Sequence, residues 1–147
     1  MATIRKIDPE EAASLIAEID AYVGNLYPAE SNHLESVEQL KRKNVAMFGA
    51  YEGSEITAMG AVKCMDGYGE IKRIYVPTIH RGKGLAKAIM ETLERHLISV
   101  GIHTSRLETG IHQHEALGLY RKGGYIECDP FGDYRPDPLS IFMEKKL

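Results

Sequence analysis

A short stretch in the middle of the chain constrains the fold more than any other. Residues 74–86 have the sequence Ile-Tyr-Val-Pro-Thr-Ile-His-Arg-Gly-Lys-Gly-Leu-Ala, which is typical of a strand that passes through a glycine-bearing turn into a long helix. The free backbone N–H groups at a helix start, together with the helix dipole, attract anions. Gly82 and Gly84 let the backbone approach an anion without an intervening Cβ. The stretch therefore predicts a phosphate-binding strand–turn–helix unit.

Two common phosphate-binding patterns do not fit this stretch. The Walker pattern requires Ser or Thr after its lysine, but Lys83 is followed by Gly84. The dinucleotide fingerprint requires a third glycine, and this chain has Lys87 at that position. On these residues alone, the alternative remains an ordinary helix start with basic surface side chains.

The chain has 147 residues, no repeat and no internal linker, so we expect a single domain over residues 1–147. Apolar residues at helical spacing predict helices over about residues 8–24, 36–43, 83–100 and 113–122. Apolar runs bounded by turn residues predict strands at about residues 3–7, 45–51, 56–65, 70–76, 105–109, 125–128 and 139–144. This order predicts an α/β (α+β) domain with a mixed sheet of about seven strands and about four flanking helices.

Composition and charge exclude several classes of function. The net charge is −3, so no basic excess indicates nucleic-acid binding. No run is long enough for a membrane span, and the N-terminus lacks a signal-peptide pattern. Cys64 and Cys128 form no CxxC motif, which favours reduced thiols in a cytoplasmic protein. His112 and His114 have no third ligand at a fitting spacing, so no metal is expected.

Two motifs in register connect the chain to a known family. Residues 81–86 fit the pattern [Q/R]-x-x-G-x-[G/A], and residues 116–125 fit A-x-x-L-Y-x-x-x-G-[F/Y]. Together they resemble the GCN5-related N-acetyltransferase (GNAT) superfamily. The element order matches along essentially the whole chain, and the motifs cover about residues 70–126. The resemblance implies a twisted, mostly antiparallel sheet with a V-shaped splay between the fourth and fifth strands.

The resemblance also implies that the donor is acetyl-CoA or another acyl-CoA. It places the pyrophosphate on the backbone amides of residues 81–86 and the pantetheine arm along residues 74–76. Gln113 stands where the family often has asparagine, so its reach toward the cofactor differs. Tyr125 replaces the more usual phenylalanine. The residues expected to bind the cofactor are Ile74, Tyr75, Val76, Arg81, Gly82, Lys83, Gly84, Leu85, Ala86, Gln113 and Tyr120.

In this family Tyr120 corresponds to the general acid that protonates the departing CoA thiolate. A phenol with a pKa near 10 suits a thiolate of similar basicity, while the alternative is a half-buried core aromatic. The acceptor amine must lose a proton, because an unperturbed lysine-like amine is only about 0.04% neutral at pH 7. Glu108 and Glu70 are candidate bases, and each also fits an exposed strand carboxylate. A backbone N–H near Tyr75 or Val76 is expected to meet the oxyanion.

The acceptor is expected at the acyl end of the cofactor, between the loops at residues 27–33 and 131–134. Both loops carry polar and aromatic side chains, which suits a small polar acceptor. Glu30 and Asp133 favour a cationic amine, although the first loop also fits a solvated connector. The candidate acceptor-binding residues are Tyr27, Glu30, Asn32, His33, Asp133 and Tyr134.

Three functions are compatible with these residues. The first is direct transfer of an acetyl group to a primary amine of a small molecule through a ternary complex, which is the mechanism that the resemblance implies. The lack of a catalytic histidine signature at either cysteine agrees with it. Acetylation of a protein or peptide ranks below it, because no recognition domain or acidic groove is visible. A non-catalytic acyl-CoA-binding module would not need Tyr120. The sequence does not name the acceptor or the preferred acyl chain. It also leaves the oligomeric state open, and a homodimer is the common arrangement for small enzymes.

Overall fold

The computed structural model describes residues 2–29 and 35–147. Within these residues the strands form one seven-stranded sheet in the order β1-β2-β3-β4-β5-β7-β6. The strands are β1 (Thr3–Lys6), β2 (Val45–Glu52), β3 (Glu55–Cys64), β4 (Gly69–Tyr75), β5 (Thr104–Gly110), β6 (Ile126–Glu127) and β7 (Ser140–Lys146). The helices are α1 (Ala13–Leu26), α2 (Val37–Leu40), α3 (Leu85–Ser99) and α4 (His114–Lys122), with short 3-10 turns η1 (Pro9–Ala12) and η3 (Thr78–His80).

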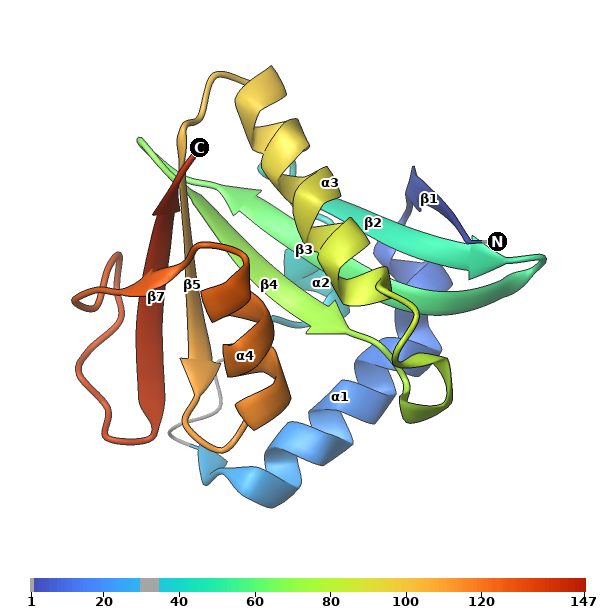
Figure 1. The fold of residues 1–147 in the computed structure, drawn as a ribbon, viewed down its shortest axis with the longest axis horizontal. Helices are drawn as coiled ribbons and strands as arrows, with labels where there is room; N and C mark the ends of the chain where they lie inside the picture. Colours follow the sequence, from blue (N-terminus) through green and yellow to red (C-terminus); the bar gives the residue numbers. More distant parts are fainter. Residues whose placement is uncertain (1, 30–34) are drawn as a thin grey trace.

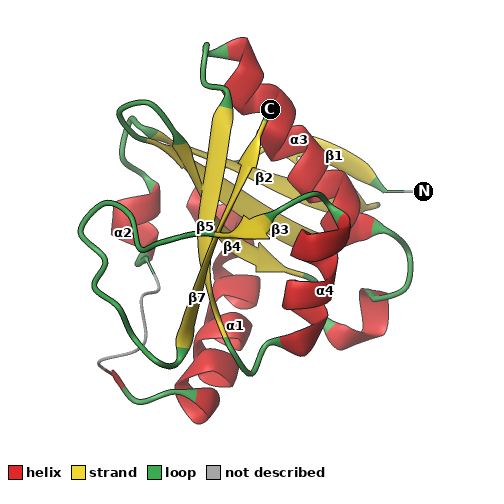
Figure 2. Ribbon diagram, turned by 60° about the vertical axis from the view of Figure 1, so that its left-hand side comes forward, coloured by secondary structure: helices red, strands yellow, loops and turns green. Residues whose placement is uncertain are grey.

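The helices cover both faces of the sheet, with α3 and α4 on one face and α1 and α2 on the other (Figures 1 and 2). Alternation along the strands supplies both interfaces: Ala46 and Ala50 of β2 face the α3 side, while Met47 between them faces the α1 side. The apolar stripe of α3 includes Ile89 and Leu93, which are completely buried. Packing on both faces confirms the expected α/β class.

The sheet opens between β4 and β5. All other neighbouring strands pair antiparallel, whereas β4 and β5 are parallel. Their ladder joins residues 69–71 to residues 105–107 and ends there, although β4 continues to Tyr75 and β5 to Gly110. Figure 1 shows the two strands starting together and then diverging. The mostly antiparallel sheet and the V-shaped splay are therefore confirmed.

A β-bulge in β4 bends the strand away from β5. The register with β3 shifts between Met59 and Ala61, and Arg73 at the bulge has a φ of 59°. Such a bulge adds a residue on one strand and increases the local bend and twist. The Arg73 side chain is buried and its Nη1 lies 2.6 Å from Oδ1 of Asp20 on α1. It also donates to the backbone carbonyl of Glu35, so tertiary contacts hold this unusual backbone conformation.

Helix ends differ from the predicted ones for local reasons. Asp8 forms a capping box with Glu11 as expected, but the first turn is the 3-10 helix η1. The helix α1 passes through Gly24 and ends at Leu26, because Gly24 does not adopt the positive φ that would end a helix there. The helix α3 begins at Leu85 rather than residue 83, because Gly84 has a φ of 76° and cannot continue a right-handed helix.

Candidate active site

The predicted phosphate clamp lies where η3 leads into α3. Gly82 has a φ of 83° and Gly84 a φ of 76°, a conformation that disfavours side chains. An added Cβ at either glycine would meet no atom within 4 Å, so both backbones border open space. The N–H of Ala88 is bonded to the Gly84 carbonyl, so the N–H groups before it are those that lack a partner within the helix. The geometry suits a bound phosphate.

A groove with a volume of about 470 Å³ runs from the end of β4 past the clamp to α4. Most predicted cofactor-binding residues line it: Ile74, Tyr75, Val76, Arg81, Gly82, Gly84, Leu85, Ala86 and Gln113. Lys83 is not among its lining residues, because the Nζ atom lies 3.2 Å from Oε2 of Glu52. The groove therefore joins the end of β4 to the open backbone of the clamp and to the start of α4.

Arg81 joins three elements at the clamp. Its Nε donates to the Val76 carbonyl at 2.9 Å, and its Nη1 lies 3.1 Å from Oε2 of Glu115 on α4. The side chain therefore ties the turn to the end of β4 and to the start of α4. These contacts hold the groove walls in place.

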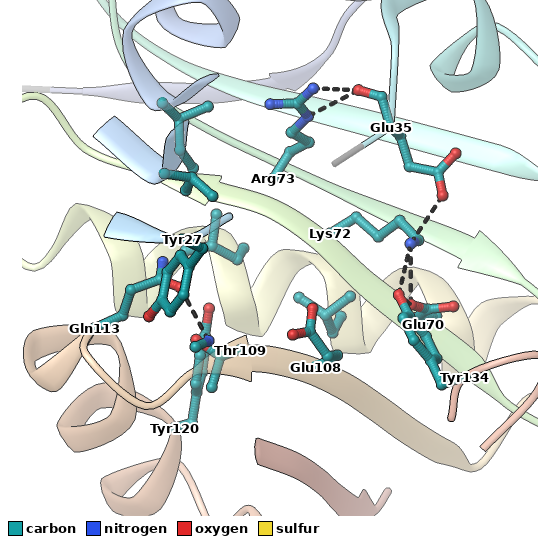
Figure 3. A pocket seen from close by; sticks show the side chains of 15 residues that line it. Tyr27, Glu35, Glu70, Lys72, Arg73, Glu108, Thr109, Gln113, Tyr120 and Tyr134 are labelled. Atoms are coloured by element: carbon teal, nitrogen blue, oxygen red, sulfur yellow. Dashed lines mark hydrogen bonds and ion pairs between the residues drawn. The ribbon is translucent and has the colours of Figure 1, made fainter. Parts of the chain in front are cut away.

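A second, smaller cavity of about 80 Å³ lies between the diverging strands (Figure 3). Ile19, Ile74 and Gln113 line both this cavity and the groove, so the two spaces share a wall. The Gln113 side chain is oriented there by the N–H of Gly110, which donates to Oε1 at 3.0 Å. The other residues of the smaller cavity are Val23, Tyr27, Glu35, Glu70, Ile71, Lys72, Arg73, Glu108, Thr109, Gly110, Tyr120 and Tyr134.

Tyr120 lines the smaller cavity rather than the groove, and it is 7% exposed. Burial raises the pKa of its phenol above the usual value, and the charge of Glu108 raises it further. Tyr120 therefore keeps its proton at neutral pH and can donate it to an anion that forms nearby. The alternative of a half-buried core aromatic does not describe this ring, which is almost fully buried.

The two candidate bases differ in their partners. Glu108 accepts a hydrogen bond at Oε2 from the Ser140 hydroxyl, at 2.8 Å. Glu70 is 5% exposed; its Oε2 lies 3.0 Å from Nζ of Lys72 and accepts from the Tyr134 hydroxyl at 2.7 Å. Both carboxylates line the cavity, so neither is the exposed strand residue that the alternative interpretation predicted.

The predicted acceptor residues have different outcomes. Tyr27 is buried in the cavity wall, where its hydroxyl accepts from the His112 N–H at 3.0 Å. Tyr134 also lines the cavity, whereas Asp133 is exposed and is not among the lining residues. The remaining three, Glu30, Asn32 and His33, lie outside the described residues.

Sequence reasoning missed three charged residues of the cavity, Glu35, Lys72 and Arg73. A signal for Lys72 was present, because residues two apart on a strand point to the same side and Glu70 was already a candidate. Glu35 and Arg73 gave no such signal, since their meeting depends on the bulge in β4 and on the packing of residue 35 against it.

Two further observations concern the described part of the chain. Among residues 2–29 and 35–147, no three histidine, cysteine or acidic side chains are grouped so that they could hold a metal ion. None of the helices in these ranges has the length and apolar character of a membrane-crossing segment.

Sequence comparison agrees with this geometry. The model of the acetyltransferase (GNAT) family matches residues 12–125. The IAA acetyltransferase of Azospirillum brasilense is 40% identical over 149 residues, covering 99% of this chain and 97% of the relative. The uncharacterized N-acetyltransferase YsnE of Bacillus subtilis is 32% identical over 148 residues, covering 97% and 98%.

Structural comparison gives the same result. A Klebsiella pneumoniae protein described as an acyl-CoA N-acyltransferase has a TM-score of 0.85 at 37% identity and covers 100% of this chain, which in turn covers 98% of it. A Thermoplasma acidophilum N-acetyltransferase in complex with coenzyme A has the same fold, with a TM-score of 0.76 at 20% identity and coverage of 100% and 99%. The family model and the close relatives show that this chain belongs to the GNAT family of acetyltransferases.

Proposed function

We propose that this protein transfers the acetyl group of acetyl-CoA directly to a primary amine of a small molecule. One observation carries the proposal: the groove at the clamp and the smaller cavity share a wall made by Ile19, Ile74 and Gln113. A thioester at the end of the groove and an amine in the cavity would meet at this wall. Such proximity replaces a bimolecular encounter by a reaction within one complex.

The clamp would hold the pyrophosphate of acetyl-CoA through backbone N–H groups of residues 81–86, which needs no side-chain charge. The pantetheine arm would follow residues 74–76, where β4 has left its ladder with β5. Free backbone groups in such a wedge can pair with the amides of the arm. A backbone N–H near Tyr75 or Val76 would then donate to the oxyanion of the tetrahedral intermediate.

The proton transfers fall to two cavity residues in this proposal. Glu108 accepts a proton from the acceptor ammonium, since the neutral amine is the nucleophile. The neutral amine nitrogen then bonds to the acetyl carbon. As the C–S bond breaks, Tyr120 donates its proton to the CoA thiolate, and the second proton lost by the nitrogen returns Tyr120 to its neutral form. Glu70 is the less suitable base, because it is already paired with Lys72 and Tyr134.

Direct transfer is favoured over a covalent intermediate on the enzyme. Burial raises the pKa of the Cys64 thiol and of the Cys128 thiol, so neither is an activated thiolate. Neither cysteine lines the groove or the smaller cavity. A small acceptor is further supported by the name of the 40% identical relative, an IAA acetyltransferase.

The test is a turnover screen that also identifies the product. Purified protein and acetyl-CoA are mixed with amines, amino acids and lysine-containing peptides, and CoA release is followed with a thiol reagent. We expect amine-dependent CoA release, an acetylated small amine in the mass spectrum, and no acetylated enzyme when the acceptor is omitted. Release with peptides alone would favour a protein acetyltransferase, and binding without release would favour a non-catalytic acyl-CoA-binding module.

A further inference from the structure

One end of the smaller cavity is built from a group of charged side chains that the proposed chemistry does not use. We call Glu35, Glu70, Lys72 and Tyr134 the far-end cluster. Nζ of Lys72 lies 2.9 Å from Oε1 of Glu35 and 3.0 Å from Oε2 of Glu70, and it donates to the Tyr134 hydroxyl at 3.2 Å. An ammonium has three N–H donors, so these contacts use all of them.

The far-end cluster lies opposite the reacting end of the cavity. In the parallel ladder, Glu70 of β4 lies opposite Arg106 of β5, where the two strands are still joined. Gly110 is the last residue of β5, beyond the point where β4 separates from it, and it lies beside Gln113 and Tyr27. Figure 3 shows the cluster on one side and the labels of Tyr27, Gln113 and Tyr120 on the other. An amine that reacts at the shared wall therefore directs its tail toward the far-end cluster.

The far-end cluster carries one negative charge in excess, because two carboxylates share one ammonium. The nearby Arg73 does not remove this excess, since its guanidinium is paired with Asp20. Lys63 and Arg42 also act electrostatically on Glu35, but neither lines the cavity, so the excess applies to the cavity wall itself. Burial alone opposes the charge on Lys72, but Glu70 and Glu35 outweigh it and raise the pKa of the ammonium. Burial also opposes the charge of Glu35, and the hydrogen bond from Lys72 outweighs it and lowers the pKa of the carboxyl. Both Lys72 and Glu35 are therefore charged at neutral pH.

The cluster can accept one more donor but not another acceptor. The contacts of the cluster use Oε1 of Glu35 and Oε2 of Glu70, so each carboxylate has a second oxygen to offer a cation. A carboxylate on the tail would face two like charges, and the N–H groups of Lys72 are already used. An unpaired buried charge of this kind is costly.

We propose that the far-end cluster selects an acceptor whose tail carries a second positive charge, so that diamines are preferred to amino acids. This inference rests on the proposed function, because it assumes that the acceptor amine reacts at the shared wall. It assigns Glu70 and Glu35 to recognition of the tail, and it makes Lys72 an internal cation that limits the net charge there.

Four amines of matched length test the inference: butylamine, aminobutanol, diaminobutane and aminobutanoate. For the wild-type protein we expect kcat/KM for diaminobutane to exceed that for aminobutanoate by about tenfold or more, with the two neutral tails between them. Equal values, or a preference for aminobutanoate, would overturn the inference. No CoA release with any amine would overturn the proposed function as well, which separates the two failures.

Two substitutions move the charge of the cluster in opposite directions. Glu70→Gln removes the excess negative charge and should reduce the ratio of kcat/KM for diaminobutane over aminobutanol. Lys72→Met increases the excess and should raise that ratio. We expect each substitution to change the ratio by about fivefold to tenfold. A purely structural defect would lower both rates together and leave the ratio unchanged.

The ratio is measured within each variant, so partial loss of stability does not affect it. If Lys72→Met does not fold, Glu35→Gln replaces it as a second neutralising variant and should reduce the ratio as Glu70→Gln does. Glu127→Gln on β6 is the matched control, because Glu127 is exposed and lines neither cavity. A ratio that stays constant, or moves in the same direction for Glu70→Gln and Lys72→Met, would contradict charge selection.

Discussion

The rings of Tyr120 and Tyr125 pack edge to face with their centroids 6.2 Å apart, yet the two hydroxyl groups have different surroundings. The Tyr125 hydroxyl lies 2.7 Å from Oγ of Ser105 and donates to Oε2 of Glu94 at 2.9 Å. The Tyr120 side chain lines the smaller cavity, where the charge of Glu108 acts on it. The Tyr125 hydroxyl is therefore held by two side chains, whereas Tyr120 lies at the proposed site of transfer.

Removal of the Tyr125 hydroxyl should affect stability and leave catalysis unchanged. In Tyr125→Phe, the fully buried Ser105 loses its partner, so we expect a loss of about 1–3 kcal/mol in the free energy of unfolding. Denaturant titration measures this loss, and kcat should stay within about twofold of wild type. A large fall in kcat without a fall in stability would contradict the structural role of Tyr125.

The predicted phosphate clamp depends on a positive φ at Gly84, which an alanine would strain, and on the open space beside it, which a methyl group would fill. Gly84→Ala places a methyl group in the open groove at a φ of 76°, at a strain cost of about 1–2 kcal/mol. We expect acetyl-CoA binding, measured by calorimetry, to weaken by about tenfold or more. The control is Gly101→Ala, since Gly101 has a φ of 82° and open space but lies after α3, away from the groove. Equal loss of binding in both variants would show that strain alone is responsible.

The smaller cavity, where we propose that the acceptor binds, depends on close packing between Gly110 and Tyr27. A Cβ at Gly110 would lie 1.8 Å from the Tyr27 hydroxyl oxygen, so Gly110→Ala must displace this side chain. We expect a loss of about 1–3 kcal/mol in stability and a raised KM for the acceptor. Gly118→Ala in α4 meets no atom within 4 Å and should instead stabilise the protein by about 0.5–1 kcal/mol. Thermal unfolding with steady-state kinetics tests both, and an unchanged KM in Gly110→Ala would contradict the assigned wall.

The proposed roles of Glu108 and Tyr120 predict how catalysis depends on pH. Because burial raises the pKa of Tyr120, its proton should remain in place and kcat should not fall as the pH rises toward 10. Glu108→Gln should lower kcat/KM by about 10²–10⁴ near neutral pH, because the base is lost. The loss should shrink as pH rises, since the neutral fraction of a free amine grows about tenfold per unit. Glu127→Gln is the control for charge, and a loss that is independent of pH would remove Glu108 as the base.

The sequence predicted the residues that line the groove better than those that line the smaller cavity. Gly82 and Gly84 could be predicted from their residue type, because glycine readily adopts the positive φ that both have before α3. The periodicity of α3 and the order of the strands also follow from local pattern. The acceptor side is assembled from distant segments, which local pattern does not reveal.

Lys72 and Glu35 illustrate this limit. Nζ of Lys72 on β4 lies 2.9 Å from Oε1 of Glu35, which stands in the loop before α2. The bulge at Arg73 determines how β4 meets this loop. A strand pattern predicts on which side a residue lies, but not a one-residue shift of register within the strand. The placement of Lys83 on Glu52 has the same origin, since the β2–β3 hairpin reaches the clamp only through the tertiary fold.

The most direct test of the account is a comparison of Tyr120→Phe with wild type in acetyl-CoA binding and in amine-dependent CoA release. The account predicts a dissociation constant for acetyl-CoA within about threefold of wild type, because Tyr120 does not line the groove. It predicts a fall in kcat of about 10²–10⁴, because the thiolate loses its proton donor. Undiminished turnover in Tyr120→Phe, with binding intact, would contradict the role of Tyr120 and with it the proposed site of acetyl transfer.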